Sequence, residues 1–147
     1  MPERKAEARW EGTLREGRGT MKLGSGAFEG KYSFGTRFES APGTNPEELI
    51  GAAHAGCYSM ALSGGLTKAG HPPKTIETKA TVHLEKVGEG FTITRIDLVS
   101  NADVPGISEP DFQRLAEETK KGCPVSRALT GVDIRLTANL TSPAPQR

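Results

Sequence analysis

The stretch EELIGAAHAGCYSMALSGGL, residues Glu47–Leu66, has the composition of a helix that another part of the fold approaches closely. Small residues fill most of it, and large side chains such as Leu49, Tyr58 and Leu62 recur only at intervals. Glycine costs a helix interior about 1 kcal/mol relative to alanine, and the close approach of another backbone can offset that loss. We therefore expect a central, enclosed helix that packs a second helix or a sheet along its small face.

Capping signals mark the ends of three helices. Asn45 has the character of an N-cap, Pro46 suits the first helical position, and the helix that they open is expected to end near Gly70. A second helix is predicted over Ser108–Gly122 and a short third one over Cys123–Leu129. The third helix begins with a cysteine, and the N–H groups and dipole of a helix N-terminus favour a thiolate.

Strand patterns complete an α+β fold. Short, turn-bounded segments with strand character precede the first helix, and alternating apolar and polar residues around the turn Gly88–Gly90 predict a long hairpin after it. The expected strands lie at 8–12, 19–23, 31–39, 75–87, 91–98 and 132–140. No linker is long enough to separate two domains, so we predict one domain over residues 1–147.

Charge and composition argue against several classes of partner. The 147 residues include 19 Lys plus Arg and 18 Asp plus Glu, so no basic field favours nucleic acid or an anionic membrane. The N-terminus MPERKAEARW lacks the apolar core of a secretory signal, and no segment approaches the roughly 18 apolar residues of a membrane span. We expect a cytoplasmic protein. Its two cysteines are too few for a secreted disulfide framework, so a bond between them would be transient chemistry.

The residues alone leave the role of Cys57 open. It is either a small core residue or a nucleophile, and His54, three positions earlier on the same helical side, is a candidate base. No orienting third residue follows from the spacing, which favours a structural or solvent-facing histidine. A zinc site from His54, Cys57 and Cys123 would lack a fourth ligand. A cysteine hydrolase or acyl-transferase using Cys57 and His54, and a non-enzymatic binding module, both remain alternatives.

Two long motifs carry a resemblance to a known family. The segment TRFESAPGTNPEELIGAAHAGCYSMALS (36–63), followed by KKGCPVSRAL (120–129), resembles the osmotically inducible protein C branch of the OsmC/Ohr family of thiol-dependent hydroperoxide reductases. The similarity extends from about Ala8 to Leu140, with the hairpin between the motifs. It implies an intertwined homodimer in which strongly bent antiparallel sheets wrap a pair of central helices.

The resemblance also implies a set of site residues. It makes Cys57 the peroxidatic cysteine and Cys123 the resolving cysteine. Arg37, in FGTRFES, matches the active-site arginine of the family, and Glu47 matches the glutamate that orients this arginine. The helix-end argument by itself favours Cys123 as the more activated thiol, so the assignment of first attack to Cys57 comes from the resemblance.

The implied activity is reduction of organic hydroperoxides, and of hydrogen peroxide less well, in oxidative or osmotic stress defence. A Cys57 sulfenic acid would condense with Cys123, and an external dithiol, of lipoyl type by the resemblance, would reopen the disulfide. No metal, haem, flavin or other cofactor is required. A collar of apolar residues beside the motifs would favour an alkyl hydroperoxide. Its expected members are Phe34, Phe38, Leu49, Ile50 and Met60.

Overall fold

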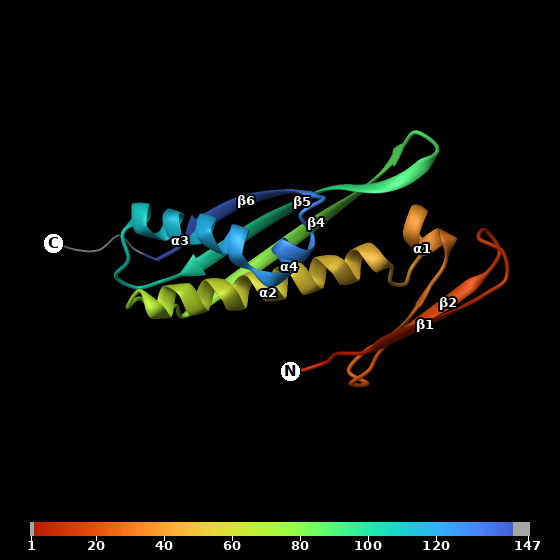
Figure 1. Cartoon of the computed structure of the whole chain (residues 1–147), viewed down its shortest axis with the longest axis horizontal. Coiled ribbons are helices and arrows are strands. Elements are labelled where there is room, and N and C mark those ends of the chain that lie inside the picture. The colour runs from red at the N-terminus through yellow and green to blue at the C-terminus, as the bar shows by residue number, and fades with distance from the viewer. Residues whose placement is uncertain (1, 143–147) are drawn as a thin grey trace. The chain divides into compact units, whose positions relative to one another are not determined.

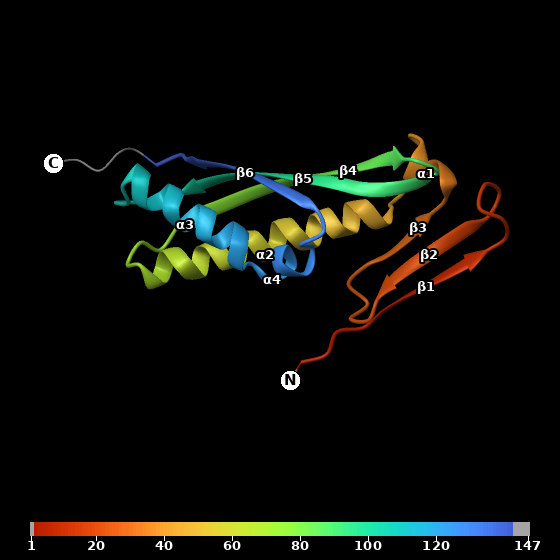
Figure 2. The same cartoon turned by 45° about the horizontal axis from the view of Figure 1, so that its top comes forward.

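The computed structural model describes residues 2–142. The chain divides into two compact units, one reaching Leu49 and one starting at Ile50. Figures 1 and 2 label the elements of each, which we describe separately. The prediction of a single domain over residues 1–147 stays a prediction. No helix in the described part of the chain is both long and apolar enough to cross a membrane.

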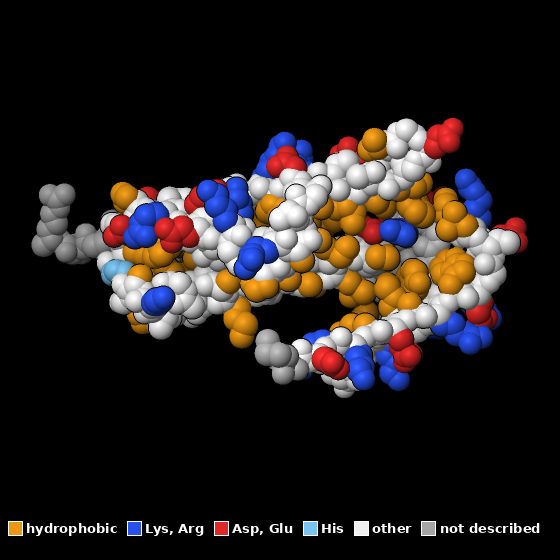
Figure 3. Space-filling model, in the orientation of Figure 1, with side chains coloured by type: hydrophobic (Ala, Val, Ile, Leu, Met, Phe, Trp, Pro, Cys, Tyr) orange, Lys and Arg blue, Asp and Glu red, His pale blue; other side chains and the backbone are white. Residues whose placement is uncertain are grey.

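The first unit contains a three-stranded antiparallel sheet in the order β1-β2-β3. Its strands are β1 (Ala6–Glu11), β2 (Arg18–Leu23) and β3 (Glu29–Tyr32). Successive side chains of β1 point to opposite faces of the sheet, so Trp10 lies on the face opposite its charged neighbours. Figure 3 shows charged side chains along one side of these strands and hydrophobic side chains on the other. Trp10 and Tyr32 stand on either side of Gly19 in the register. A Cβ on Gly19 would lie 2.5 Å from the Tyr32 ring, so the glycine gives the aromatic pair its space.

A short helix replaces the end of the predicted third strand. The prediction of a strand over 31–39 is wrong beyond Tyr32, because α1 (Phe34–Phe38) begins there. Ser33 and Thr36 form a capping box: each side chain accepts a hydrogen bond from the backbone N–H of the other. This local bonding outweighs the strand propensity of the aromatic residues and places Arg37 on a helix.

The long helix predicted from the sequence is α2 (Pro46–Lys68). The Asn45 side chain accepts a hydrogen bond of 2.7 Å from the N–H of Glu48, which confirms Asn45 as the N-cap. Only one glycine of this helix lies against the sheet: a Cβ on Gly51 would lie 3.3 Å from Val82. At the helical glycines farther along, no described atom beyond the neighbouring turns of α2 itself comes within 4 Å of such a Cβ, so the expected close approach is absent there within residues 2–142. These are Gly56, Gly64 and Gly65.

The second unit is built on the sheet β4-β5-β6. The predicted hairpin is confirmed as β4 (Thr75–Val87) and β5 (Gly90–Asp103), an antiparallel pair. The last strand, β6 (Asp133–Leu140), pairs with β5 in parallel. The resemblance implies antiparallel sheets, whereas this sheet is mixed, because the helical connection between β5 and β6 returns the chain in the same direction. The α+β class is confirmed.

Helices α2, α3 (Glu109–Gly122) and α4 (Pro124–Ala128) lie on one face of this sheet (Figures 1 and 2). Alternate β5 residues point into the layer between sheet and helices and are fully or almost fully buried. The principal apolar residues of this core are Tyr58, Leu62 and Leu66 from α2, Ile96, Leu98 and Ala102 from β5, and Phe112 and Ala116 from α3. This packing brings the middle of α2 beside the junction of α3 and α4.

Candidate active site

The fold of the second unit brings the two cysteines together. Cys57 is in the middle of α2, and Cys123 is the residue at which α3 ends and α4 begins. Their Sγ atoms lie 2.9 Å apart, although 66 positions separate them in the sequence. Both are free thiols; Cys123 is buried and Cys57 is partly exposed. A disulfide needs a sulfur separation of about 2.05 Å, so a small movement would join them.

The hydrogen bonds around the two sulfurs are unequal. Burial opposes charge on Cys123, but its contact with Cys57 and the neighbouring polar groups of Val125 and Ser126 outweigh burial and hold the pKa of Cys123 below its usual value. Burial raises the pKa of Cys57, and the bond to Cys123 raises it further. Within this unit Cys123 is therefore the more acidic of the two thiols, as its position at a helix N-terminus indicates.

His54 is buried and bonded away from Cys57. Its Nε2 lies 2.8 Å from the Oγ of Ser126, on α4, and its exposed fraction is 0%. Burial lowers the pKa of His54, which keeps its ring neutral. Its full burial excludes the solvent-facing interpretation of this histidine. No hydrogen bond joins His54 to Cys57 among the described side chains, so the geometry gives the hydrolase alternative no base at Cys57.

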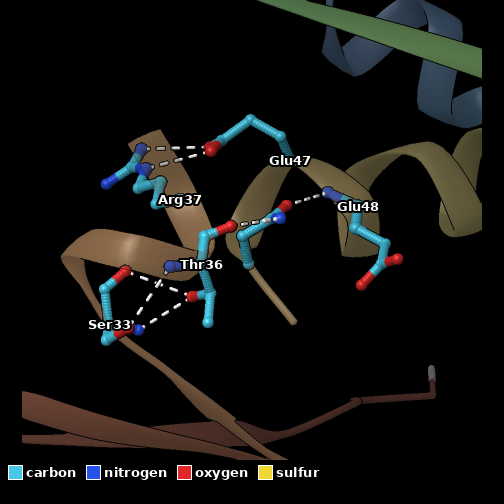
Figure 4. A network of polar contacts seen from close by, with 6 residues as sticks. Ser33, Thr36, Arg37, Glu47 and Glu48 are labelled. Carbon is cyan, nitrogen blue, oxygen red and sulfur yellow. Dashed lines mark hydrogen bonds and ion pairs between the residues drawn. The ribbon is translucent and has the colours of Figure 1, made fainter. Parts of the chain in front are cut away.

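Arg37 and Glu47 form a bidentate ion pair in the first unit (Figure 4). The Nε and Nη2 atoms of Arg37 donate to Oε1 and Oε2 of Glu47, both at 3.0 Å. The Glu47 side chain is 8% exposed and that of Arg37 is 37% exposed. The carboxylate is thus enclosed, while the third guanidinium nitrogen points away from it. A cation held by two parallel bonds has a fixed direction as well as a fixed position.

Asn45 ties the helix of Arg37 to the helix of Glu47. Its side-chain Nδ2 donates to the carbonyl of Thr36 at 3.0 Å, while its Oδ1 caps α2 (Figure 4). The capping box at Ser33 fixes the other end of the same turn. Four local hydrogen bonds therefore set the distance between the guanidinium and the carboxylate.

The four predicted site residues thus fall into two pairs. Arg37 and Glu47 are joined in the first unit, and Cys57 and Cys123 in the second. Glu47 and Cys57 are ten positions apart on α2. At 1.5 Å per residue this places them about 15 Å apart along the helix axis.

An aromatic pocket of about 250 Å³ adjoins Arg37 within the first unit. Phe34 and Phe38, two predicted members of the apolar collar, line it, and their ring centroids lie 5.0 Å apart. The other three predicted members, Leu49, Ile50 and Met60, are not among its lining residues. The structure adds Trp10 of β1, Leu14 of the loop between β1 and β2, and Tyr32 of β3.

Sequence reasoning missed Ser126 and the bridging role of Asn45. The sequence identifies Asn45 as a cap, but the second bond of Asn45 depends on α1, a segment whose sequence predicts a strand. Ser126 lies one helical turn from Cys123, and this spacing is the signal that could have identified it. Within residues 2–142, no three His, Cys, Asp or Glu side chains are grouped as metal ligands.

Comparison with known proteins adds to this geometry. The sequence profile of a family described as OsmC-like protein matches residues 38–137. The chain is 51% identical to peroxiredoxin OsmC of Escherichia coli (strain K12) over 127 residues, 86% of this chain and 89% of that protein. It is 30% identical to the organic hydroperoxide resistance protein of Xanthomonas axonopodis pv. citri (strain 306) over 97 residues, 65% of this chain and 66% of that one.

A solved structure gives the same result for the fold. The organic hydroperoxide resistance protein OhrB of Bacillus subtilis superposes with a TM-score of 0.73 at 25% sequence identity. The superposition covers 91% of this chain and 97% of that one. The arrangement of strands and helices described above is therefore shared with a protein named for hydroperoxide resistance.

Proposed function

Because this chain belongs to the OsmC family, we propose that it is a thiol-dependent peroxidase that reduces organic hydroperoxides with Cys57 and Cys123. The observation that carries this proposal is the 2.9 Å separation of the two sulfur atoms. The names of its relatives, a peroxiredoxin and a hydroperoxide resistance protein, describe the same chemistry. The resemblance seen in the sequence motifs is confirmed.

In the proposed reaction, the Cys57 thiolate attacks one oxygen of the substrate R–O–O–H. The O–O bond breaks, the sulfur is oxidised to sulfenic acid, and the other oxygen leaves as an alkoxide that takes a proton to become an alcohol. The Cys123 thiolate then attacks the Cys57 sulfur, a disulfide forms and hydroxide leaves. A dithiol reductant reopens the disulfide by exchange, becoming a disulfide itself.

The first step requires a cation beside Cys57, and no cation among the described residues of its own unit contributes to the pKa shift of this thiol. Burial and Cys123 both oppose a thiolate at Cys57. Arg37 fits the requirement, because Glu47 holds its guanidinium in one orientation and leaves one edge open. We assign Arg37 to stabilising the Cys57 thiolate and the leaving oxygen, and Glu47 to positioning Arg37.

We propose that a second copy of the chain supplies this arginine. One guanidinium on Glu47 does not reach a sulfur about 15 Å farther along the same helix. The exposed side of α2 supports a helix partner, since Ala52, Gly56, Met60 and Gly64 recur every four residues and Met60 is 80% exposed. Two such helices packed antiparallel would carry Glu47 of one copy toward Cys57 of the other, giving two composite sites per homodimer.

The aromatic pocket beside Arg37 suits the organic part of the substrate. Its wall of aromatic rings offers apolar surface to an alkyl or aryl group, whereas hydrogen peroxide has no such group to bury. We therefore propose a preference for organic hydroperoxides over hydrogen peroxide. For the reductant we propose an external dithiol of the lipoyl type, because a dithiol closes its own disulfide after exchange.

One experiment tests the reaction directly. The reduced protein is mixed with one equivalent of cumene hydroperoxide, free thiols are alkylated, and the products are analysed by mass spectrometry. We expect both thiols to be lost, with an intramolecular disulfide between Cys57 and Cys123 and one equivalent of cumyl alcohol. Persistence of both thiols would contradict the peroxidase and leave the binding module in its place.

A further inference from the structure

Two aromatic rings of the first unit form a stack with an arginine at each end. The ring centroids of Phe34 and Phe38 are 5.0 Å apart, and the planes of the rings are inclined at 51°. The guanidinium carbon of Arg15 lies over the Phe34 ring, 4.8 Å from its centroid, and that of Arg37 lies over the Phe38 ring at 5.3 Å. Both distances are within the roughly 6 Å over which a cation and an aromatic face attract each other. Each ring therefore has a cation of its own.

Helix geometry explains three members of this stack. Phe34, Arg37 and Phe38 follow the spacing i, i+3 and i+4 in α1, and residues at these intervals are neighbours on the surface of a helix. Arg15 reaches Phe34 from the loop between β1 and β2. The five-residue helix that presents the cation of the proposed reaction thus also sets an aromatic ring against it.

The ion pair with Glu47 holds the Arg37 guanidinium by one edge. Its two bonds, both at 3.0 Å, fix that edge, but the group can still swing about it. The Arg37 side chain is 37% exposed, so the surrounding protein encloses it only in part. Contact of the guanidinium carbon with the Phe38 ring gives a third point of support, which opposes the swing.

We propose that Phe38 is a positioning residue for Arg37: its ring supports the guanidinium that Glu47 holds at one edge. The inference rests on the proposed peroxidase function, in which Arg37 stabilises the thiolate and the leaving oxygen. Phe34 stacks on Arg15, which has no part in that reaction, so the Phe34 ring serves the organic group of the substrate alone. Loss of the Phe38 ring therefore slows the reaction with every peroxide, whereas loss of the Phe34 ring slows it only with organic ones.

Two peroxides distinguish support of the cation from binding of the substrate. Hydrogen peroxide has no organic group to bury against the aromatic pocket, but its reaction needs the same cation. Reduced protein is mixed rapidly with an excess of cumene hydroperoxide or of hydrogen peroxide. The second-order rate constant for loss of the Cys57 thiol is then measured by alkylation and mass spectrometry. The variants are Phe38→Leu, Phe38→Tyr and Phe34→Leu, since leucine keeps an apolar side chain without the ring and tyrosine keeps the ring.

Phe38→Leu should lower both rate constants by about fivefold, as loss of one partly exposed cation–π contact implies. Phe38→Tyr should retain most of both rates. Phe34→Leu should lower the rate constant for cumene hydroperoxide alone. Phe28→Leu is the control that should match the parent protein with both peroxides, because Phe28 lies outside the lining of the aromatic pocket. Unfolding curves of each variant identify any loss of fold.

A double-mutant cycle tests whether Phe38 acts through Arg37. Phe38→Leu is combined with Arg37→Gln, because the glutamine amide can still bond Glu47 but carries no charge for the ring to support. The cycle uses cumene hydroperoxide, for which we expect the faster reaction. The effect of Phe38→Leu should largely disappear in the Arg37→Gln background. An undiminished effect there would show that the ring acts by binding the substrate, and would overturn the inference.

The remaining outcomes separate the inference from the proposed function. A parent protein whose thiols persist with both peroxides removes the two together. A parent protein that is oxidised, with a Phe38→Leu variant that is slower only with cumene hydroperoxide, removes the inference alone and leaves Phe38 as a wall of the pocket. Equal losses of rate in Phe38→Tyr and Phe38→Leu also remove it, because the aromatic face would then have no effect on the cation.

Discussion

Both carboxylate oxygens of Glu47 accept hydrogen bonds from one edge of the Arg37 guanidinium, each at 3.0 Å. Because the carboxylate is enclosed and the guanidinium is more exposed, Glu47 is the fixed member of the pair and Arg37 is the member presented outward. The pair is complete within the first unit, and so are the bonds that place it. Orientation of the cation is therefore a local property of that unit.

Glu47→Ala should lower kcat/KM for cumene hydroperoxide by about a hundredfold, because the freed guanidinium loses the orientation that catalysis needs. Glu47→Gln, which can make one of the two bonds, should lose less. Glu48→Gln is the matched control, since this neighbouring carboxylate bonds Thr44 rather than Arg37. Steady-state kinetics with purified, folded variants decide the matter. Equal effects of Glu47→Gln and Glu48→Gln would contradict a specific role for the ion pair.

The two cysteines should differ in which step they serve. Cys57→Ser should abolish peroxide consumption, because no sulfur remains to attack the peroxide. Cys123→Ser should still consume one equivalent and then accumulate sulfenic or more oxidised Cys57, because no second thiol resolves it. Mass spectrometry after one equivalent of peroxide, with a sulfenic acid trap, distinguishes these products. Loss of the first oxidation in Cys123→Ser would exchange the assigned roles.

The aromatic pocket should determine substrate preference. The parent protein should turn over cumene hydroperoxide faster than hydrogen peroxide, and Phe34→Ala should raise KM for the organic substrate several-fold with little change for hydrogen peroxide. Phe28→Ala serves as the control, because Phe28 lies outside the lining of this pocket and is 38% exposed. A parent protein that prefers hydrogen peroxide would rule out the pocket as a substrate site.

Asn45→Ala should affect stability and activity together. It removes the cap of α2, worth about 1 kcal/mol of unfolding free energy, and also the bond that holds α1. Ser108→Ala removes the comparable cap of α3, which is not connected to Arg37. Chemical denaturation should show a loss of stability in both variants, larger in Asn45→Ala because it loses two bonds, and peroxidase assays should show a fall in kcat/KM for Asn45→Ala only. Equal activity of the two would show that the bond to Thr36 does not position Arg37.

The sequence predicts the helices and strands better than it predicts how the strands pair in the sheets. Helix caps at Asn45 and Ser108 and the turn at Gly88 are short-range signals, and the structure confirms them. The parallel pairing of β6 with β5 depends on how α3 and α4 cross the sheet, which no local pattern records. The helix around Arg37 was missed because a capping box in a five-residue helix competes with a strand pattern over the same residues.

In the candidate site too, some residues could be identified from the sequence, whereas a contact between distant residues could not. Motif likeness identified Arg37, Glu47, Cys57 and Cys123, and the structure brings each of the two pairs into contact. The contact between His54 and Ser126 could not be predicted, because 72 positions separate them in the sequence and only the packing of α4 against α2 brings them together. Long-range contacts of this kind are set by tertiary packing rather than by local propensity.

Within the described chain, no close neighbour covers the glycines at 56, 64 and 65 on α2, although each costs helix stability. A second copy of α2 packed on this side would give those positions a neighbour and would place the cation of one copy beside the thiol of the other.

Mixed dimers test whether the site is shared. Cys57→Ser and Glu47→Ala, each nearly inactive alone, are refolded together with different affinity tags, and the heterodimer is purified by both tags. If Glu47 of one copy serves Cys57 of the other, the heterodimer contains one site with both residues intact, and about half of the parent activity per dimer should return. If each site forms within one copy, neither site has both residues and no activity returns. A purified heterodimer without peroxidase activity would therefore exclude the composite site, whereas a protein that stays monomeric at assay concentrations would exclude it before any mixing.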